Sequence, residues 1–150
     1  MRAVLQRVRN AEVSVDGVVS GSIERGLLIY LGVQDSDDEN IVRRLADKIR
    51  KLRIFADENH KMNLSVEDVG GQILVVSQFT LYADLCKGNR PSWDKAGKPD
   101  HANRLYEYFI RCMEESGLVV GHGVFGADMV VKYENMGPVT IIADSDEILK

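Results

Sequence analysis

The chain has 150 residues, of which 45% are hydrophobic, and this is enough for one domain with a substantial core. Its 19 basic and 23 acidic residues give a formal net charge of −4, so no overall positive field holds a long nucleic-acid duplex. Any contact with nucleic acid must therefore be local. Arginines interrupt the first apolar positions, and no later run is as long as a membrane span. We expect a single domain over residues 1–150, soluble and cytoplasmic, with no membrane contact.

The first quarter of the chain has the pattern of antiparallel strands. Residues 2–8 predict a strand, and Asp16 and Gly17 form a turn signal between two β-branched segments. Residues 26–33 are apolar throughout, which is typical of a strand buried on both faces. The chain is therefore expected to open with a hairpin and a central strand.

Two amphipathic helices are predicted. Ser36 and Glu39 have the spacing of a capping box, and the apolar periodicity that follows predicts a helix to about residue 54. Pro99 is typical of a first helical turn, and Gly117 of a C-terminal cap. The apolar stripe between them consists of Ala102, Leu105, Tyr106, Phe109 and Met113.

The remaining segments are loops and strands. Residues 56–71 are polar and end in Gly-Gly, which predicts a loop, whereas residues 72–81 predict a strand. Residues 82–99 form a long polar connection of the kind that is usually functional or mobile. Three short β segments lie within residues 118–125, 129–135 and 139–144. The order βββαβαβββ predicts an α+β domain with a mostly antiparallel, barrel-like sheet and two main helices.

The segment GHGVFG, residues 121–126, has the glycine spacing of a dinucleotide-binding loop. Such a loop must open a helix, because the pyrophosphate binds at the helix N-terminus. The residues that follow are β-branched and predict a strand, so we interpret the segment as a glycine-rich turn. This interpretation leaves Phe125, in the middle of the turn, unexplained.

Polar side chains gather at the end of the strand predicted over residues 72–81, in the segment SQFT. Strand alternation places Gln78 and Thr80 on one face and Ser77 and Phe79 on the other. A hydroxyl at a strand end is most often only hydrogen-bonded, and a nucleophile would need a base. None of the three histidines lies in a recognisable triad setting. For a hydrolase, we expect catalysis by oriented backbone N–H groups more than by a covalent intermediate.

Three further features bear on the chemistry. Lys87 and Arg90 lie in a loop segment, KGNRPS, that suits binding of one or two phosphates, and a solvated basic loop is an equally good interpretation. The two cysteines lack metal-ligand spacing, so we expect free thiols and no metal site. Gly137 and Pro138 interrupt the last apolar run, which predicts a bend or an edge strand because proline has no N–H to donate.

Four motifs in this order, SQFTLYAD, KGNRPS, FGADM and NMGPVT, resemble those of the D-aminoacyl-tRNA deacylases. The resemblance extends over nearly the whole chain, to about residue 145. It implies a homodimer that hydrolyses the ester joining a D-amino acid, or glycine mischarged on a non-cognate tRNA, to the 3′-terminal adenosine. Aminoacyl-tRNA is then the partner, and no cofactor is implied.

The resemblance also implies how the site is built. The segment Ser77, Gln78, Phe79 and Thr80 contributes the catalytic wall, and main-chain amides near Phe79 and Ala102 stabilise the oxyanion. The ribose 2′-hydroxyl of the substrate assists. Assistance by the substrate agrees with the sequence, in which no histidine is recognisable as a catalytic base.

Chiral selection is implied to rest on Gly137 followed by a cis-Pro138, which reaches into the pocket of the partner subunit. Backbone carbonyls there bind the substrate's α-amino group and exclude an L side chain, so specificity comes from rejection. Arg7 is expected to brace these carbonyls from behind. Two positions depart from the family pattern, Met136, where an acidic residue is common, and Ala83, where glycine is common.

Phe125 and Met129 are implied to line the pocket of the terminal adenine, and Lys87 and Arg90 to contact phosphates. Two alternatives stay open at this point. A related deacylase with a trans Gly-Pro bond would accept other substrates, and a module that binds RNA 3′ ends would not catalyse at all. The sequence does not reveal the isomer, the preferred tRNAs or whether a histidine approaches the site.

Overall fold

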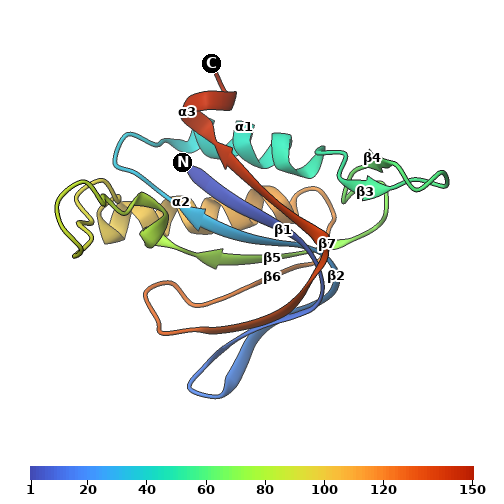
Figure 1. Cartoon of the computed structure of the whole chain (residues 1–150), viewed down its shortest axis with the longest axis horizontal. Helices are drawn as coiled ribbons and strands as arrows, with labels where there is room; N and C mark the ends of the chain where they lie inside the picture. The colour runs from blue at the N-terminus through green and yellow to red at the C-terminus, as the bar shows by residue number, and fades with distance from the viewer.

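A strongly curved five-stranded sheet forms the centre of the protein (Figure 1). The computed structural model describes all 150 residues. The strand order is β6-β5-β2-β1-β7. The strands are β1 (Arg2–Val15), β2 (Val18–Gly32), β5 (Gln72–Ser77), β6 (Val120–His122) and β7 (Val130–Asp144).

The α+β prediction is confirmed, and the sheet is more mixed than expected. β1 pairs antiparallel with β2 and with β7, whereas β2–β5 and β5–β6 are parallel. The parallel pairs follow from the connections, because the chain crosses from β2 to β5 through α1 (Glu39–Arg50) and from β5 to β6 through α2 (Pro99–Glu114).

The strands are longer than predicted. Asp16 and Gly17 form the expected turn with φ of 49° and 79°, but one strand, β1, extends from Arg2 to that turn. Asn10, also at a positive φ of 49°, lies within β1, where the pairing with β7 is irregular. The predicted strand at 26–33 is likewise the second half of β2, so the first three predicted segments are two strands.

The helices begin and end slightly differently from the prediction. The N-cap of α1 is Asp38, whose carboxylate accepts the Ile41 N–H at 2.8 Å, so Ser36 is not the cap. α1 ends at Arg50 rather than near residue 54. Pro99 is the first residue of α2, as predicted, and a short third helix, α3 (Ser145–Ile148), was not predicted.

The segment expected to be a loop at 56–71 contains part of a small second sheet. Its strands are β3 (Phe55–Ala56) and β4 (Met62–Leu64), paired antiparallel. Strands of two and three residues carry too little alternation to be predicted from sequence. No helix of the protein has the length and apolar character needed to cross a membrane.

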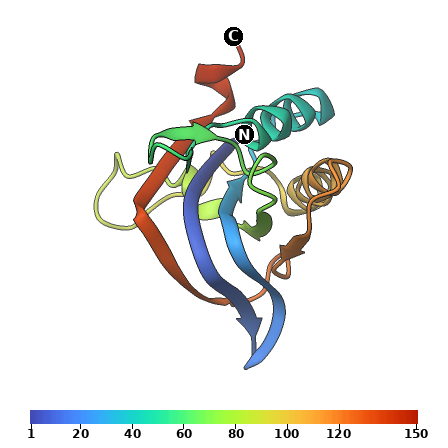
Figure 2. The ribbon, with the colours of Figure 1, turned by 90° about the vertical axis from the view of Figure 1, so that its right-hand side faces the viewer.

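Both faces of the main sheet are buried, against different partners. α1 and α2 lie on one side of it (Figure 2), where the larger core includes Leu27, Ile29, Leu45 and Phe109. On the other face, a smaller core is closed by side chains of β7 and of the residue before it. This second core consists of Val8, Ala11, Val13, Ile23, Leu28, Leu74 and Val76, with Met129, Val131 and Tyr133 packed against it.

Candidate active site

A cavity of about 730 Å³ lies where β5 ends and α2 begins, a size typical of small-ligand sites. Its walls come from the end of β5, the 83–98 loop, the first turn of α2 and the 123–129 turn before β7. The cavity collects these predicted site residues: Ser77, Gln78, Phe79, Ala102, Phe125 and Met129. Apart from the polar ends of the first two, this set is apolar.

The SQFT segment changes conformation within the motif. β5 ends at Ser77, and Phe79–Tyr82 form a 3-10 helix, η1, so the predicted strand over residues 72–81 is too long. Gln78 and Thr80 come together because Gln78 Nε2 donates to Thr80 Oγ1, not because of strand alternation. Phe79 is 57% exposed and lines the cavity, whereas Thr80 does not line it.

The backbone donors at the cavity differ in one respect from the prediction. Phe79 is the first residue of η1, and the first N–H groups of a helix have no acceptor within that helix. The Ala102 N–H, in contrast, donates to the Lys98 carbonyl at 2.8 Å, so Ala102 contributes its side chain to the wall. In α2 it is Asp100 and His101 whose N–H groups precede the first intrahelical bond.

No acid–base pair is assembled at the SQFT hydroxyls. Neither Ser77 nor Thr80 is hydrogen-bonded to a histidine, and the Nδ1 of His122 lies 2.7 Å from the carbonyl of Gly123 instead. Tyr106, which also lines the cavity, donates its hydroxyl to the Val75 carbonyl at 3.1 Å, and burial raises the pKa of its phenol. No group of three or more His, Cys, Asp or Glu side chains is placed to hold a metal ion.

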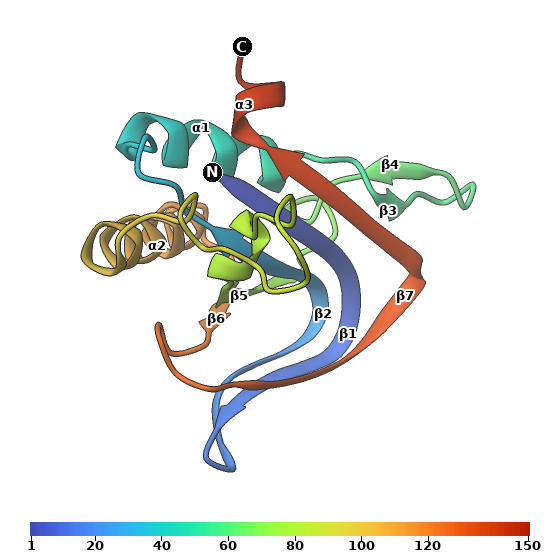
Figure 3. The same ribbon diagram turned by 60° about the vertical axis from the view of Figure 1, so that its left-hand side comes forward.

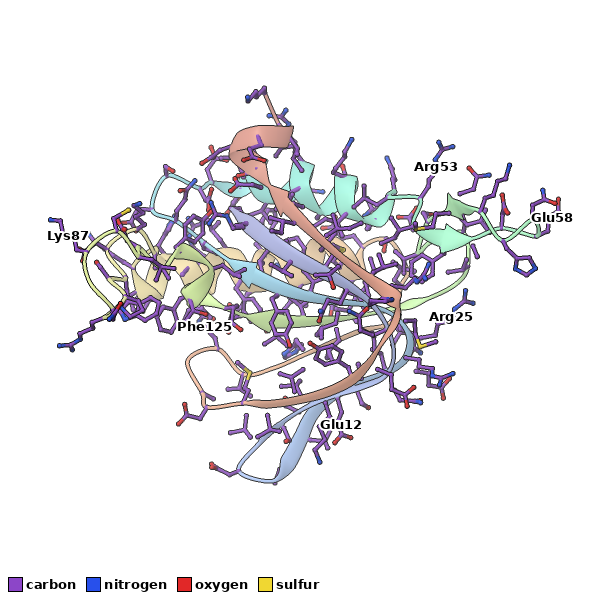
Figure 4. All side chains as sticks on the ribbon, viewed as in Figure 1. Glu12, Arg25, Arg53, Glu58, Lys87 and Phe125 are labelled. Atoms are coloured by element: carbon purple, nitrogen blue, oxygen red, sulfur yellow. The ribbon has the colours of Figure 1, made fainter.

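Phe125 has a clear place in the structure. β6 ends at His122 and the chain turns into β7, so the glycine-rich segment is the turn that was expected and opens no helix. The Phe125 ring, labelled in Figure 4, has its centroid 5.8 Å from that of the Tyr106 ring, and Phe125 lines the cavity. A Cβ at Gly123 would lie 2.5 Å from Met129 Sδ, so a side chain there would require the Met129 side chain to move.

The long polar connection supplies a cavity residue that the sequence did not indicate. Trp93 lines the cavity, with its ring centroid 5.1 Å from that of Phe79 and an interplanar angle of 73°. A single tryptophan in a polar loop forms no pattern, so only the structure locates it. Lys87 and Arg90 belong to the same loop but do not line the cavity, and Figure 4 shows Lys87 at the tip of the loop.

The Gly-Pro segment lies elsewhere in the chain's fold. Gln6 pairs with Thr140 and Val8 with Asn135, so residues 136–139 of β7 bulge opposite one residue of β1. β7 is an edge strand and turns a corner here (Figure 3), as predicted, although it continues beyond the corner. The Gly137–Pro138 peptide bond is cis, both residues are exposed, and neither lines the cavity.

Arg7 holds this bulge, although not at the carbonyls that were expected. Its Nε donates to the carbonyl of Met136 at 3.1 Å, and its Nη1 donates to the carbonyl of Ile54 at 2.8 Å. Nη2 lies 2.8 Å from where a Cβ on Gly137 would stand. The guanidinium therefore links the bulge to Ile54, just before β3. Its acceptor in the bulge, Met136, is one residue before the Gly-Pro pair that was predicted to be contacted.

Comparisons with known proteins agree with this architecture. A family model described as D-Tyr-tRNA(Tyr) deacylase matches residues 4–144. A protein of Koribacter versatilis named D-aminoacyl-tRNA deacylase is 57% identical over 145 residues, 97% of each chain. One of the same name from Aquifex aeolicus is 55% identical over 148 residues, 99% of this chain and 100% of that one.

Two of the solved structures that share the fold differ in how similar their sequences are to this chain. One, named c-Myc DNA Unwinding Element Binding Protein, has a TM-score of 0.89 and 38% identity, covering 96% of this chain and 98% of that one. The other, named a probable eukaryotic D-amino acid tRNA deacylase, has a TM-score of 0.83 at 18% identity and covers 95% and 97%, which shows the fold alone.

The fold and the matches together place the chain among single-domain α+β enzymes of the hydrolase class, which act on an ester bond. The chain belongs to the D-Tyr-tRNA(Tyr) deacylase family, many of whose members are named D-aminoacyl-tRNA deacylase. The resemblance carried by the four sequence motifs is thereby confirmed.

Proposed function

We propose that this protein hydrolyses the ester bond of D-aminoacyl-tRNA and of glycine mischarged on a non-cognate tRNA. Water adds to the ester carbonyl, the bond to the ribose oxygen breaks, and the products are the free amino acid and tRNA with its terminal hydroxyl restored. The observation that carries the proposal is the cavity, because Phe79 lines it together with Phe125 and Met129, which come from a turn more than forty residues further along the chain.

The apolar wall suits the terminal adenosine. Phe125 and Met129 offer a ring and a polarizable sulfur to a flat base, and both stand on the 123–129 turn. The ester then lies toward η1, where the Phe79 N–H has no acceptor within its helix and can stabilise the oxyanion. The 2′-hydroxyl of the substrate assists the water, since no side-chain base adjoins Ser77 or Thr80.

Chiral selection requires a second copy of the chain. Gly137 and Pro138 are exposed and do not line the cavity of their own chain, and the edge position of β7 leaves them free to enter the cavity of a partner. In the proposed homodimer their carbonyls bind the substrate's α-amino group and occupy the space an L side chain would need. Glycine and D-amino acids then fit the same site.

The basic residues of the 83–98 loop complete the proposed contact with tRNA. Lys87 and Arg90 are exposed and lie in the loop that forms the rim of the cavity. They are suited to the phosphates that precede the terminal nucleoside. This local contact is compatible with a net charge of −4.

The test is hydrolysis of D-tyrosyl-tRNA, L-tyrosyl-tRNA and glycyl-tRNA with a non-cognate tRNA, followed as release of the labelled amino acid. We expect turnover of the D and glycyl substrates and none of the L substrate. Binding of the tRNA 3′ end without turnover of any substrate would instead support a non-catalytic RNA-binding module.

A further inference from the structure

Two exposed aromatic side chains, Phe79 and Trp93, line the cavity, and the proposed chemistry gives Trp93 no role. Phe79 is 57% exposed and Trp93 41% exposed, although large aromatic side chains are usually buried. Their rings are nearly perpendicular, at 73°, so each keeps at least one flat face that the other does not cover. An uncovered indole face next to a cavity is a surface on which a base can stack.

The position of Trp93 is set by the backbone around it. Asp84 and Ser92 form an isolated antiparallel bridge, with N–H to carbonyl distances of 2.8 and 3.0 Å in the two directions. Asp84 also pairs with Lys95 at 3.0 Å. On the other side, the Ala96 N–H donates to the Trp93 carbonyl at 2.9 Å. The loop therefore presents the indole in a defined place, which lowers the entropy cost of binding.

The loop is also tied to the body of the protein beyond Trp93. The Gly97 N–H donates to the Val33 carbonyl at 2.8 Å, and the Lys98 N–H donates to Asp35 Oδ1 at 2.9 Å. These bonds hold the rim of the cavity against the end of β2. A ligand that leaves the cavity on this side must pass Trp93.

The location of Trp93 decides which nucleotide it meets. Phe125 and Met129, on the 123–129 turn, are half-buried, whereas Trp93 is exposed and belongs to the loop that carries Lys87 and Arg90. A strand whose terminal adenine occupies the inner wall must leave toward solvent, with its first phosphodiester near those cations. We infer that Trp93 stacks on the base of the penultimate nucleotide and so recognises a 3′ end longer than one nucleoside.

This inference rests on the proposed function. Two probes distinguish a failure of the inference about Trp93 from a failure of the proposed function. The first is a D-tyrosyl adenosine whose ester is replaced by a 3′ amide, which is not hydrolysed. The second is the same molecule extended at its 5′ side by cytidylate. Trp93 is the only tryptophan of the chain, so quenching of tryptophan fluorescence, excited at a wavelength that tyrosine does not absorb, reports on this side chain alone.

We expect the dinucleotide to bind wild-type protein about tenfold more tightly than the nucleoside, as one stacked base typically provides. By calorimetry, Trp93→Ala should lose this advantage and bind both probes alike, whereas Trp93→Phe should keep most of it. With D-tyrosyl-tRNA, Trp93→Ala should raise KM about tenfold and change kcat little. Leu85→Ala is the matched control, because Leu85 is an exposed side chain of the same loop outside the cavity wall.

Equal affinity of wild-type protein for the two probes, together with normal hydrolysis of D-tyrosyl-tRNA, would overturn the role of Trp93 and leave the proposed function standing. An equal loss of affinity for both probes in Trp93→Ala would also overturn it, since the indole would then contact the terminal nucleoside. Absence of both nucleoside binding and hydrolysis in wild-type protein would overturn the proposed function itself.

Discussion

Arg7 on β1 donates a hydrogen bond from Nε to the carbonyl of Met136 at 3.1 Å, which ties the bulge of β7 to the strand beside it. The same guanidinium reaches the Ile54 carbonyl at 2.8 Å through Nη1. Two main-chain carbonyls from distant parts of the chain are thus oriented by one planar side chain, which places the exposed Gly137 and Pro138.

Replacing Arg7 by lysine should loosen the bulge without removing the charge. A single ammonium cannot reproduce the fork that reaches both carbonyls, so kcat/KM for D-tyrosyl-tRNA should fall about tenfold. Arg9→Lys is the control, because Arg9 forms an exposed ion pair with Glu134 on the same strands and such pairs contribute little. Equal activity of the two variants would show that Arg7 does not position the bulge.

Gly137→Ala should damage both stability and activity. Gly137 has φ of +123°, and a Cβ there would lie 2.8 Å from Arg7 Nη2 and 3.0 Å from a methyl of Val139. We expect a loss of about 2 kcal/mol in the free energy of unfolding, measured by denaturant titration. Gly70→Ala, at φ of +61° with nothing near its Cβ, should cost about 1 kcal/mol and leave kcat unchanged.

Thr80→Ala should keep substantial activity. The Thr80 hydroxyl accepts from Gln78 Nε2 and does not line the cavity, so it can position Gln78 but is poorly placed to attack the ester. We expect kcat within about tenfold of wild type, since one neutral hydrogen bond is lost, and recovery in Thr80→Ser. An acyl adduct on Thr80, trapped by mass spectrometry after rapid quenching, would contradict this.

The proposed homodimer can be tested by mixing two defective chains. Gly137→Ala keeps an intact cavity, and Phe125→Ala keeps an intact bulge, so a mixed dimer contains one site with both parts intact. Refolding equal amounts together should restore about a quarter of wild-type activity, because half of the dimers are mixed and each has one working site of two. Activity equal to the mean of the separate variants would rule out sharing between subunits.

The 83–98 loop should hold its shape down to low pH. The Cys86 N–H and then Lys95 lower the pKa of Asp84 to about 2. Because this pKa is depressed, the contribution of Asp84 is complete above about pH 4 and is lost as the pH falls toward 2. Trp93 emission should therefore stay constant from pH 7 to 4 and shift to the red below that.

Asp84→Asn provides the check on this assignment. The variant loses the ion pair with Lys95, so its Trp93 emission should already be shifted at pH 7 while far-UV circular dichroism stays native. Wild-type emission in Asp84→Asn at pH 7 would show that other bonds of the loop suffice.

Features set by neighbouring residues were predicted well from sequence. The periodicity of α1 and α2 and the Asp16-Gly17 turn are local, and each is present at or close to the predicted place. The parallel pairing of β5 depends on how the helices cross the sheet, and no local pattern encodes it.

In the site, too, residues in local motifs could be predicted from sequence, whereas residues placed by distant contacts could not. Through resemblance, the SQFT and FGADM motifs pointed to Phe79, Phe125 and Met129, which line the cavity, whereas Gly137 and Pro138 do not line it. Trp93 was missed because its place depends on distant bonds, such as the one between Gly97 and Val33. The contact of Arg7 with the Met136 carbonyl likewise depends on a bulge whose register no sequence pattern reveals.

The burial of both sheet faces has a consequence for how reliably the chain folds. Leu27 and Ile29 point into the helix-side core, while Leu28 between them points into the other, and β5 alternates in the same way with Val75 and Val76. A slip of one residue would exchange the contents of the two cores, whose shapes differ. The central strands therefore have no alternative register that fills both spaces, and misaligned sheets are rejected while the protein folds.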